Sequence, residues 1–182
     1  MRVITGTARG RRLLTVPGKD SRPTTARVKE AIFSVIQFDM EGRRVLDLFA
    51  GTGQMGIEAL SRGAAGAVFV DNCPKALAVI RRNLDHLGLA GQSQIVSGDA
   101  LTFVRRRPAP FDIIFLDPPY HGKLLFDALD CVSLVDILHP GGIIICETTF
   151  DVLPPELPPP YRREKIYRYG VPTVCFYRRE PW

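Results

Sequence analysis

Short apolar runs alternate with helical stretches between residues 44 and 147, and this alternation constrains the fold more than any other feature of the sequence. Runs rich in β-branched and aromatic residues predict strands, and a 3.6-residue apolar period predicts the helices between them. Such alternation is typical of an α/β fold with a mostly parallel sheet and right-handed crossovers. We expect strands at 44–49, 66–71, 93–97, 111–117 and 142–147, and helices at 54–62, 74–87, 100–106 and 123–137.

The segments on either side of this region have patterns of their own. Residues 22–36 predict a helix, because Pro23 and two threonines suit a helix start and apolar residues recur on one face. Five prolines between residues 154 and 160 exclude a helix or a central strand there. The runs 161–169 and 172–179 then predict a closing antiparallel pair of strands.

Residues 1–20 predict a basic arm in front of one globular unit, residues 21–182. Within the arm, residues 2–5 and 12–16 are expected to pair as a hairpin. The first 30 residues carry eight Lys or Arg and two acidic residues, so the rest of the chain has a net charge of −1 within a total of +5. Such a basic segment is typical of binding to a phosphate backbone, and a solvated basic surface is the alternative. The residues expected to contact RNA are Arg9, Arg11, Arg12, Arg22 and Arg27.

The composition excludes several other classes of protein. With 46% hydrophobic and 24% charged residues, a chain of 182 residues is long enough for one domain with a sizeable core. No apolar stretch is long enough to span a bilayer and none resembles a signal peptide, so we expect a cytoplasmic protein with no membrane partner. The four cysteines form no C-x-x-C pair, which argues against both a zinc site and a disulfide framework, and no metal is expected.

A glycine-rich turn follows the first expected strand. Gly51, Gly53 and Gly56 match the pattern G-x-G-x-x-G, in which glycine lets the backbone turn sharply and approach a cofactor. The pattern alone is a weak signal, because it fits a dinucleotide site, an S-adenosylmethionine site or a tight turn without a ligand. Asp71 ends the next expected strand, where a carboxylate can accept hydrogen bonds from both hydroxyls of a ribose.

Acidic residues end three successive expected strands, and together they favour a cofactor site. Asp47 lies beside the glycine-rich turn, where a carboxylate suits a cationic amino-acid moiety better than a pyrophosphate. Asp99 is placed to meet an adenine amino group, although it also suits a cap of the helix that begins at Ala100. The residues expected to hold S-adenosylmethionine are Asp47, Phe49, Gly51, Gly53, Asp71, Asn72, Asp99 and Ala100.

A second turn, Asp117-Pro118-Pro119-Tyr120, comes at the end of the strand expected at 111–117. An exocyclic amine of a base is a poor nucleophile, because its lone pair is delocalised into the ring. The Asp117 carboxylate and the Pro118 carbonyl can each accept one N–H of such an amine, the two prolines stiffen the turn, and Tyr120 can stack on the base. These four residues are the expected catalytic residues, and the base must be flipped out or lie in an open RNA. The structural alternative is a plain loop in which Tyr120 covers the core; the role of the adjoining His121 is left open.

Further motifs extend over nearly the whole chain: Arg9-Gly10-Arg11, Arg22-Pro23-Thr24-Thr25, Glu58-Ala59-Leu60-Ser61-Arg62-Gly63-Ala64 and Arg168-Tyr169-Gly170. With the two turns, they resemble the bacterial small-subunit ribosomal RNA guanine-N2 methyltransferase family. The resemblance implies a class I methyltransferase fold, a Rossmann-like sheet of seven strands whose last strand is antiparallel. It also implies S-adenosylmethionine as the cofactor, and a guanine of small-subunit rRNA, naked or in the assembling subunit, as the substrate of a monomer. The sequence departs from the family at Asp71, where Glu is more usual, and at Gln54-Met55, which replace smaller residues.

Three alternatives stay open on the sequence. An adenine-N6 methyltransferase acting on DNA or RNA shares the Asp-Pro-Pro-Tyr turn. An NAD-linked oxidoreductase shares the glycine-rich turn, but it leaves Asp117 and its prolines without a role. A non-catalytic RNA-binding factor of ribosome assembly keeps the fold, but it gives no reason to hold a carboxylate beside two prolines.

Overall fold

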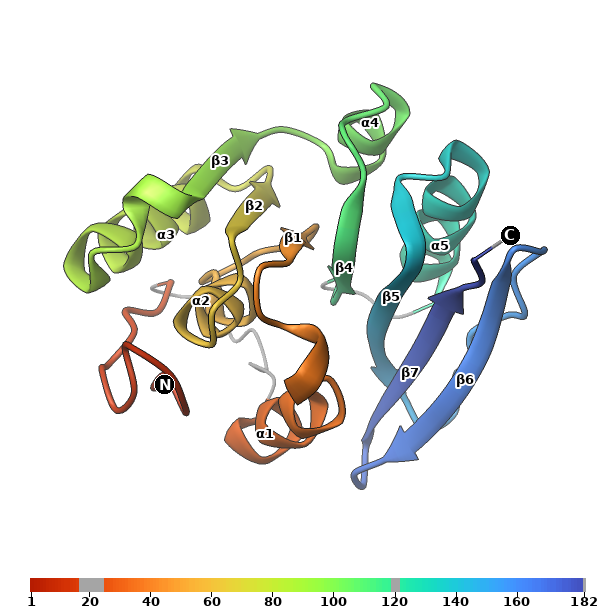
Figure 1. Cartoon of the computed structure of the whole chain (residues 1–182), viewed down its shortest axis with the longest axis horizontal. Coiled ribbons are helices and arrows are strands. Elements are labelled where there is room, and N and C mark those ends of the chain that lie inside the picture. Colours follow the sequence, from red (N-terminus) through yellow and green to blue (C-terminus); the bar gives the residue numbers. More distant parts are fainter. Residues whose placement is uncertain (17–24, 119–121, 182) are drawn as a thin grey trace.

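The computed structural model describes residues 1–16, 25–118 and 122–181. Its centre is a sheet of seven strands in the order β3-β2-β1-β4-β5-β7-β6 (Figure 1). The strands are β1 (Arg44–Asp47), β2 (Gly66–Asp71), β3 (Ser93–Ser97), β4 (Phe111–Leu116), β5 (Leu138–Thr149), β6 (Tyr161–Arg168) and β7 (Pro172–Arg179).

The first five strands are parallel to one another, whereas β7 is antiparallel to both of its neighbours, β5 and β6. A seven-stranded mixed sheet with an antiparallel last strand is thus confirmed. The chain builds outward from β1 to β2 and β3, then returns to place β4 on the other side of β1. In open α/β sheets the crevice outside the carboxyl ends of the strands at such a reversal is the usual ligand site.

Five α-helices cover the two faces of the sheet (Figure 1). They are α1 (Ala26–Val35), α2 (Gln54–Ser61), α3 (Pro74–Leu87), α4 (Ala100–Arg105) and α5 (Lys123–Val135), and two 3₁₀ turns, η1 (Gln37–Asp39) and η2 (Ala90–Gln92), complete the helical elements. One core joins α1, α2 and α3 to one face, and a second core joins α4 and α5 to the other. Neighbouring residues of the inner strands alternate between these cores, as Val45 and Leu46 do in β1, because both faces of a parallel sheet are covered.

The expected elements are found, with changes at their ends. The first helix begins at Ala26 rather than near Pro23, with Thr25 as its cap: the Thr25 hydroxyl accepts a hydrogen bond from the Val28 N–H at 3.3 Å. The fifth strand starts at Leu138, four residues earlier than expected, and its register against β4 shifts between Phe111 and Ile113. Apolar spacing does not reveal such a shift, because residues 139–142 have no partner in β4 and carry no apolar pattern.

The basic arm forms less regular structure than expected. One antiparallel bridge, Arg2 with Arg12, replaces the two paired strands, because most of the segment between them is a series of turns. Val3, Ala8 and Leu13 are nevertheless buried in the core beside α2. The first 16 residues therefore pack on the body of the fold.

Two kinds of feature are absent from the described residues. No helix there is long and apolar enough to cross a membrane. Within the same residues, no three or more His, Cys, Asp or Glu side chains converge as metal ligands would.

Candidate active site at the carboxyl edge of the sheet

The glycine-rich turn connects β1 to α2 through backbone conformations that favour glycine. Gly51 and Gly53 have φ angles of +54° and +77°, and the Gly53 N–H donates to the Ala50 carbonyl at 2.6 Å. Gly56 permits a different contact, since a Cβ atom there would lie 2.3 Å from the Phe69 ring. The three glycines thus turn the chain and seat α2 directly on the sheet.

Asp71, at the end of β2, holds this turn in place. Its Oδ2 accepts a hydrogen bond from the Gly51 N–H, and its Oδ1 accepts one from the Cys73 N–H, each at 2.8 Å. The side chain is only partly buried, and each carboxylate oxygen has a second lone pair that can accept from a ribose hydroxyl. The sequence did not reveal this scaffolding role. Asn72 follows Asp71 and is exposed at the same edge.

Asp47 ends β1 and is buried, with 4% of its surface exposed. Its Oδ2 accepts a hydrogen bond from the Gly56 N–H at 3.0 Å. Burial raises the pKa of Asp47 to about 7; the Gly56 hydrogen bond opposes this rise and the negative charge of Asp71 adds to it. A cationic ligand group beside Asp47 would compensate the buried carboxylate.

Asp47→Asn is expected to remove a pH dependence of stability. Because the folded-state pKa is raised, the contribution of Asp47 is complete below about pH 4 and is lost as the pH rises through 7. The asparagine keeps an oxygen for the Gly56 N–H and does not ionise. Between pH 5 and pH 8 the stability of the variant relative to wild type should rise by roughly 2–3 kcal/mol, as measured by urea unfolding. A constant difference between the two proteins would show that Asp47 does not titrate in this range.

Asp99, after β3, caps α4, as the structural alternative expected. Its Oδ1 accepts a hydrogen bond from the Thr102 N–H at 2.8 Å, and this hydrogen bond holds the pKa of the carboxyl below its usual value. The side chain is exposed, and it keeps its second oxygen for another donor. Ala100 is buried behind it, and Phe49, beyond β1, packs partly buried against the same core.

Asp117 and Pro118 follow β4 directly and lie next to the end of β1. Asp47 pairs with Phe115 in the register of β1 and β4, and the Leu48 N–H donates to the Phe115 carbonyl at 3.2 Å. Asp117 comes two residues after Phe115, the partner of Asp47, and therefore lies at the same carboxyl edge of the sheet. Asp117 is partly buried and Pro118 is buried. The predicted residues Pro119 and Tyr120, with the adjoining His121, lie outside the described residues.

Buried polar atoms without partners also lie near this edge. Among the described side chains, three buried oxygens lack a hydrogen bond: Oε1 of Gln54, Oγ1 of Thr148 and Oγ1 of Thr173. Gln54 begins α2 immediately after the glycine-rich turn, and Thr148 pairs with Thr173 one residue before β5 ends. A buried acceptor without a hydrogen bond costs free energy of folding. The unpaired Oε1 of Gln54 fits a site that receives N–H donors from a ligand.

Asn83, on α3, is a positioning residue that the sequence analysis missed. Its Oδ1 accepts a hydrogen bond from the Leu14 N–H at 2.8 Å, and its Nδ2 lies 3.2 Å from the carbonyls of both Leu14 and Thr52. One buried amide thus joins the arm to the glycine-rich turn. A polar residue in the otherwise apolar face of this helix, three residues after Ile80, was the signal that marked it.

The predicted RNA-binding arginines differ in what they contact. Arg9, Arg12 and Arg27 are exposed, and none of their side chains makes a hydrogen bond or ion pair within the described part of the chain. Arg11 instead donates to the carbonyl of His86, at the end of α3, at 2.9 Å. Arg22 lies outside the described residues. Three of the five cations are therefore available to an anionic partner.

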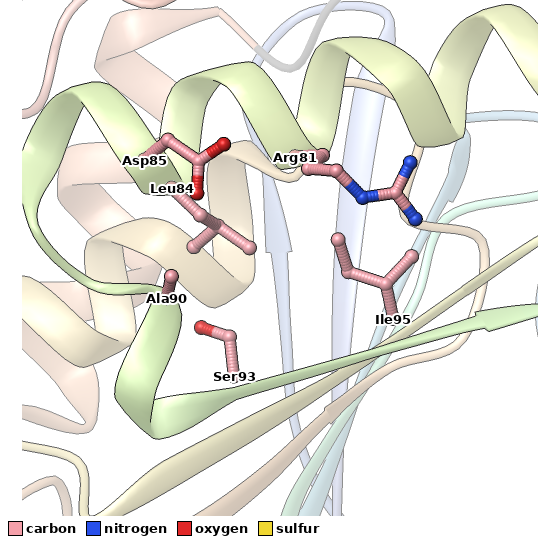
Figure 2. A pocket seen from close by; sticks show the side chains of 6 residues that line it. All are labelled: Arg81, Leu84, Asp85, Ala90, Ser93 and Ile95. Carbon is pink, nitrogen blue, oxygen red and sulfur yellow. The ribbon is translucent and has the colours of Figure 1, made fainter.

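Two surface hollows of the described structure lie away from these residues. One of about 330 Å³ lies between α3 and β3, and Figure 2 shows that its six lining side chains come from both sides. A second of about 470 Å³ lies between α4 and α5. Neither contains a predicted site residue, so the geometry of the strand ends is the better guide to the chemistry.

Comparison with known proteins identifies the family of the chain. The model of a family described as "Conserved hypothetical protein 95" matches residues 1–178. "Ribosomal RNA small subunit methyltransferase D" of Escherichia coli is 32% identical over 182 residues, which cover 99% of this chain and 90% of that protein. The chain belongs to this methyltransferase family. "Putative rRNA methyltransferase YlbH" of Bacillus subtilis is 40% identical to this chain, and the match covers 99% of that protein.

A solved structure supports the same assignment for the methyltransferase. "Putative methyltransferase yhhF" from Escherichia coli superimposes with a TM-score of 0.89 at 32% identity, over 100% of this chain and 99% of that one. The predicted class I methyltransferase fold and the predicted family are thus confirmed. The oxidoreductase alternative is excluded by the family.

Proposed function

We propose that this methyltransferase transfers a methyl group from S-adenosylmethionine to the exocyclic N2 amine of a guanine in small-subunit ribosomal RNA. The observation that carries the proposal is the position of Asp117 and Pro118, one strand away from the glycine-rich turn at the reversal point of the sheet. A donor held by the turn and an amine held after β4 would meet at this edge. The names of the E. coli and B. subtilis relatives support rRNA as the substrate.

The residues of the edge fit S-adenosylmethionine, which supplies an electrophilic methyl group on a positively charged sulfur. The buried Asp47 suits the cationic end, and no atom would lie within 4 Å of a Cβ at Gly51, so the turn leaves room for close approach. Asp71 accepts the ribose hydroxyls, with Asn72 beside it, and Asp99 lies at the adenine end. Oε1 of Gln54 accepts one further N–H. Phe49, Gly53 and Ala100 complete the expected site.

Asp117 and Pro118 prepare the amine for attack. The Asp117 carboxylate and the Pro118 carbonyl each accept one N–H, so that the nitrogen becomes tetrahedral and its lone pair points away from the ring. Bound S-adenosylmethionine would supply its methyl group to this lone pair, with the electrons of its S–C bond remaining on sulfur. The nitrogen then releases one proton, for which Asp117 is the nearest base of the proposed site. Pro119 stiffens the turn, and Tyr120 stacks on the base.

The test of this function uses tritiated S-adenosylmethionine with naked small-subunit rRNA, assembled small subunits and DNA, followed by analysis of the labelled nucleosides. Label in N2-methylguanosine from rRNA or subunits is the expected result. Label in N6-methyladenosine would overturn the choice of base and favour the adenine-N6 alternative. No label from a protein that binds the cofactor and rRNA would favour the assembly-factor alternative.

The exposed arginines of the arm give a separate prediction about RNA binding. Replacing both Arg9 and Arg12 with alanine should weaken RNA binding and lower the slope of log K against log salt by up to about 0.9 per lost phosphate contact on duplex-like RNA. Folding should be unaffected, because neither side chain has a partner in the described residues. Arg43→Ala is the matched control, since Arg43 pairs with Asp112 at the opposite edge of the sheet. An equal slope in all three proteins would place the RNA elsewhere.

A further inference from the structure

The hairpin of β6 and β7 brings its tip to the same edge of the sheet as the candidate active site. Thr149, which ends β5, pairs with Pro172, and Arg168 pairs with Thr173, so the turn between the two strands follows the carboxyl end of β5. Figure 1 shows this tip beside α1, and the charge of Arg27 in α1 acts on Tyr169 at the tip. Strand β6 lies three strand spacings from β4, about 14 Å.

Cations are distributed unevenly along this hairpin. At the end far from the active site every arginine is paired with an acid: Arg162 with Glu164 and Glu180, Arg163 with Glu156, Arg178 with Glu164, and Arg179 with Asp136. Towards the tip, Lys165, Arg168 and the neighbouring Arg27 are exposed, and none has such a partner within the described residues. Six residues, or about 20 Å of strand, separate Arg162 from Arg168. Positive charge is thus neutralised at one end of the hairpin and unopposed at the other.

Aromatic and apolar side chains accompany the unpaired cations. The rings of Tyr167 and Tyr169 stack with centroids 6.3 Å apart, and Phe176 holds Tyr167 edge-on at 5.7 Å. Phe150 is 63% exposed, and its N–H donates to the carbonyl of Val171, itself 41% exposed. Exposed apolar groups that gather in one place mark interaction sites, and here Phe150 and Val171 are joined by a hydrogen bond just beyond the ends of β5 and β6.

We propose that this hairpin-tip surface, with Arg27, Lys165 and Tyr169 on the α1 side of the sheet and Phe150 and Arg168 around the tip, binds the single-stranded RNA that flanks the target nucleotide. The proposal rests on the proposed function. Proteins usually bind single-stranded nucleic acid through aromatic rings and neighbouring cations. The bases stack on the rings, and the cations contact the phosphates. Two acids of this region, Glu147 on β5 and Asp151 just after it, each have an interaction of their own. A protein partner is disfavoured, because three unpaired cations would need matching acids.

The position of the surface explains what it contributes to the reaction. A base that enters the Asp117 turn must leave its stack, and its neighbours have to be held while it does so. The 14 Å from β4 to β6 spans only a few nucleotides of an RNA strand. The surface therefore holds the strand on one side of the target, whereas the arm contacts phosphates from the other side of the fold.

The test compares the wild type with Phe150→Ala and with a triple variant in which Arg27, Lys165 and Arg168 are replaced by glutamine. Arg162→Gln is the control, because Arg162 lies at the end of the hairpin where the arginines are paired with acids. Affinity for small-subunit rRNA, its salt dependence, KM and cofactor affinity are measured for each. Phe150→Ala should weaken RNA binding by roughly 5- to 150-fold, the loss of one stacked base. The triple variant should lower the slope of log K against log salt by up to about 2, because each of three lost phosphate contacts on a single strand contributes about 0.7. Arg162→Gln should change neither, and cofactor affinity should be unchanged in all of them.

Equal RNA affinity and salt slope in the wild type, Phe150→Ala and the triple variant would overturn the hairpin-tip proposal even if the wild type methylates rRNA. Conversely, a wild type that binds rRNA without methylating it would overturn the proposed function, and the binding measurements would still decide the role of the surface. Thermal unfolding of each variant separates lost contacts from lost structure, since the replaced side chains are exposed. Phe150→Trp, which keeps a stacking ring, should restore RNA affinity.

Discussion

Asp117→Ala is expected to lower methyl transfer at least about a hundredfold and to leave the affinity for S-adenosylmethionine near that of the wild type. In the proposed function Asp117 contacts the amine and not the cofactor, so the loss falls on the chemical step. Alanine removes both the acceptor that orients one N–H and the group nearest to the departing proton. Positioning and proton transfer each contribute at least about two orders of magnitude in enzymes.

Two matched variants make this prediction specific. Asp117→Asn keeps one acceptor oxygen but loses the charge, so its activity should lie between those of the wild type and the alanine variant. Asp47→Asn should show the opposite pattern, with weaker cofactor binding, because Asp47 is assigned to the cationic end of the cofactor. Single-turnover methyl transfer and calorimetric cofactor binding measure the two effects. A comparable loss of cofactor affinity in Asp117→Ala would contradict the assignment of Asp117 to the amine.

Glu58→Gln is expected to lower the free energy of unfolding by about 3–5 kcal/mol, because it leaves a buried lysine without its counter-ion. Glu58 is 0% exposed and lies 3.2 Å from Nζ of Lys29, which is 1% exposed. The same carboxylate accepts hydrogen bonds from the N–H groups of Ile4 and Thr5 at 2.8 and 3.0 Å and from Arg62 at 2.9 Å. Burial lowers the pKa of Lys29, and the charge of Glu58 opposes that shift.

A double-mutant cycle tests whether the two charges depend on each other. Adding Lys29→Met to Glu58→Gln should recover part of the lost stability, since the fully buried charge that lost its counter-ion is then removed as well. Asp127→Asn is the surface control: it breaks the exposed pair with Lys123 and should cost less than about 1 kcal/mol. Additive effects of the two core substitutions in urea unfolding would mean that Lys29 and Glu58 are not coupled.

The loss of Glu58 should also change function, because this residue fixes the start of the arm. Its two backbone hydrogen bonds hold residues 4 and 5 against α2, and the adjacent Ser61 accepts one from the Ala8 N–H at 3.0 Å. From there the arm reaches Asn83 and the glycine-rich turn. The residues proposed to bind RNA and those proposed to bind the cofactor are therefore joined through the same few side chains.

Much of the fold could be predicted from sequence, because strand and helix patterns are local. The parallel arrangement then followed from the alternation of strands with helices, and it implied that Asp47, Asp71, Asp99 and Asp117 meet at one edge. Element ends were less accurate, as at Leu138, since pairing between strands and not the residues themselves determines where a ladder begins. The hairpin expected in the arm was reduced to one bridge because α2 and α3 supply Ile4 and Leu14 with partners that the opposite strand would have supplied.

The sequence by itself determined the order of elements and the chemical groups at the strand ends, because both depend on residues that are neighbours in the chain. Only the tertiary structure decided what each charged or polar group contacts. Leu14 lies 69 residues from Asn83 in sequence, and Ile4 lies 54 from Glu58. Burial, which raises the pKa of Asp47, and pairing, which neutralises Arg162 but not Arg168, are likewise produced by residues brought together from distant segments. No local pattern records these contacts, because each depends on how the whole sheet is assembled.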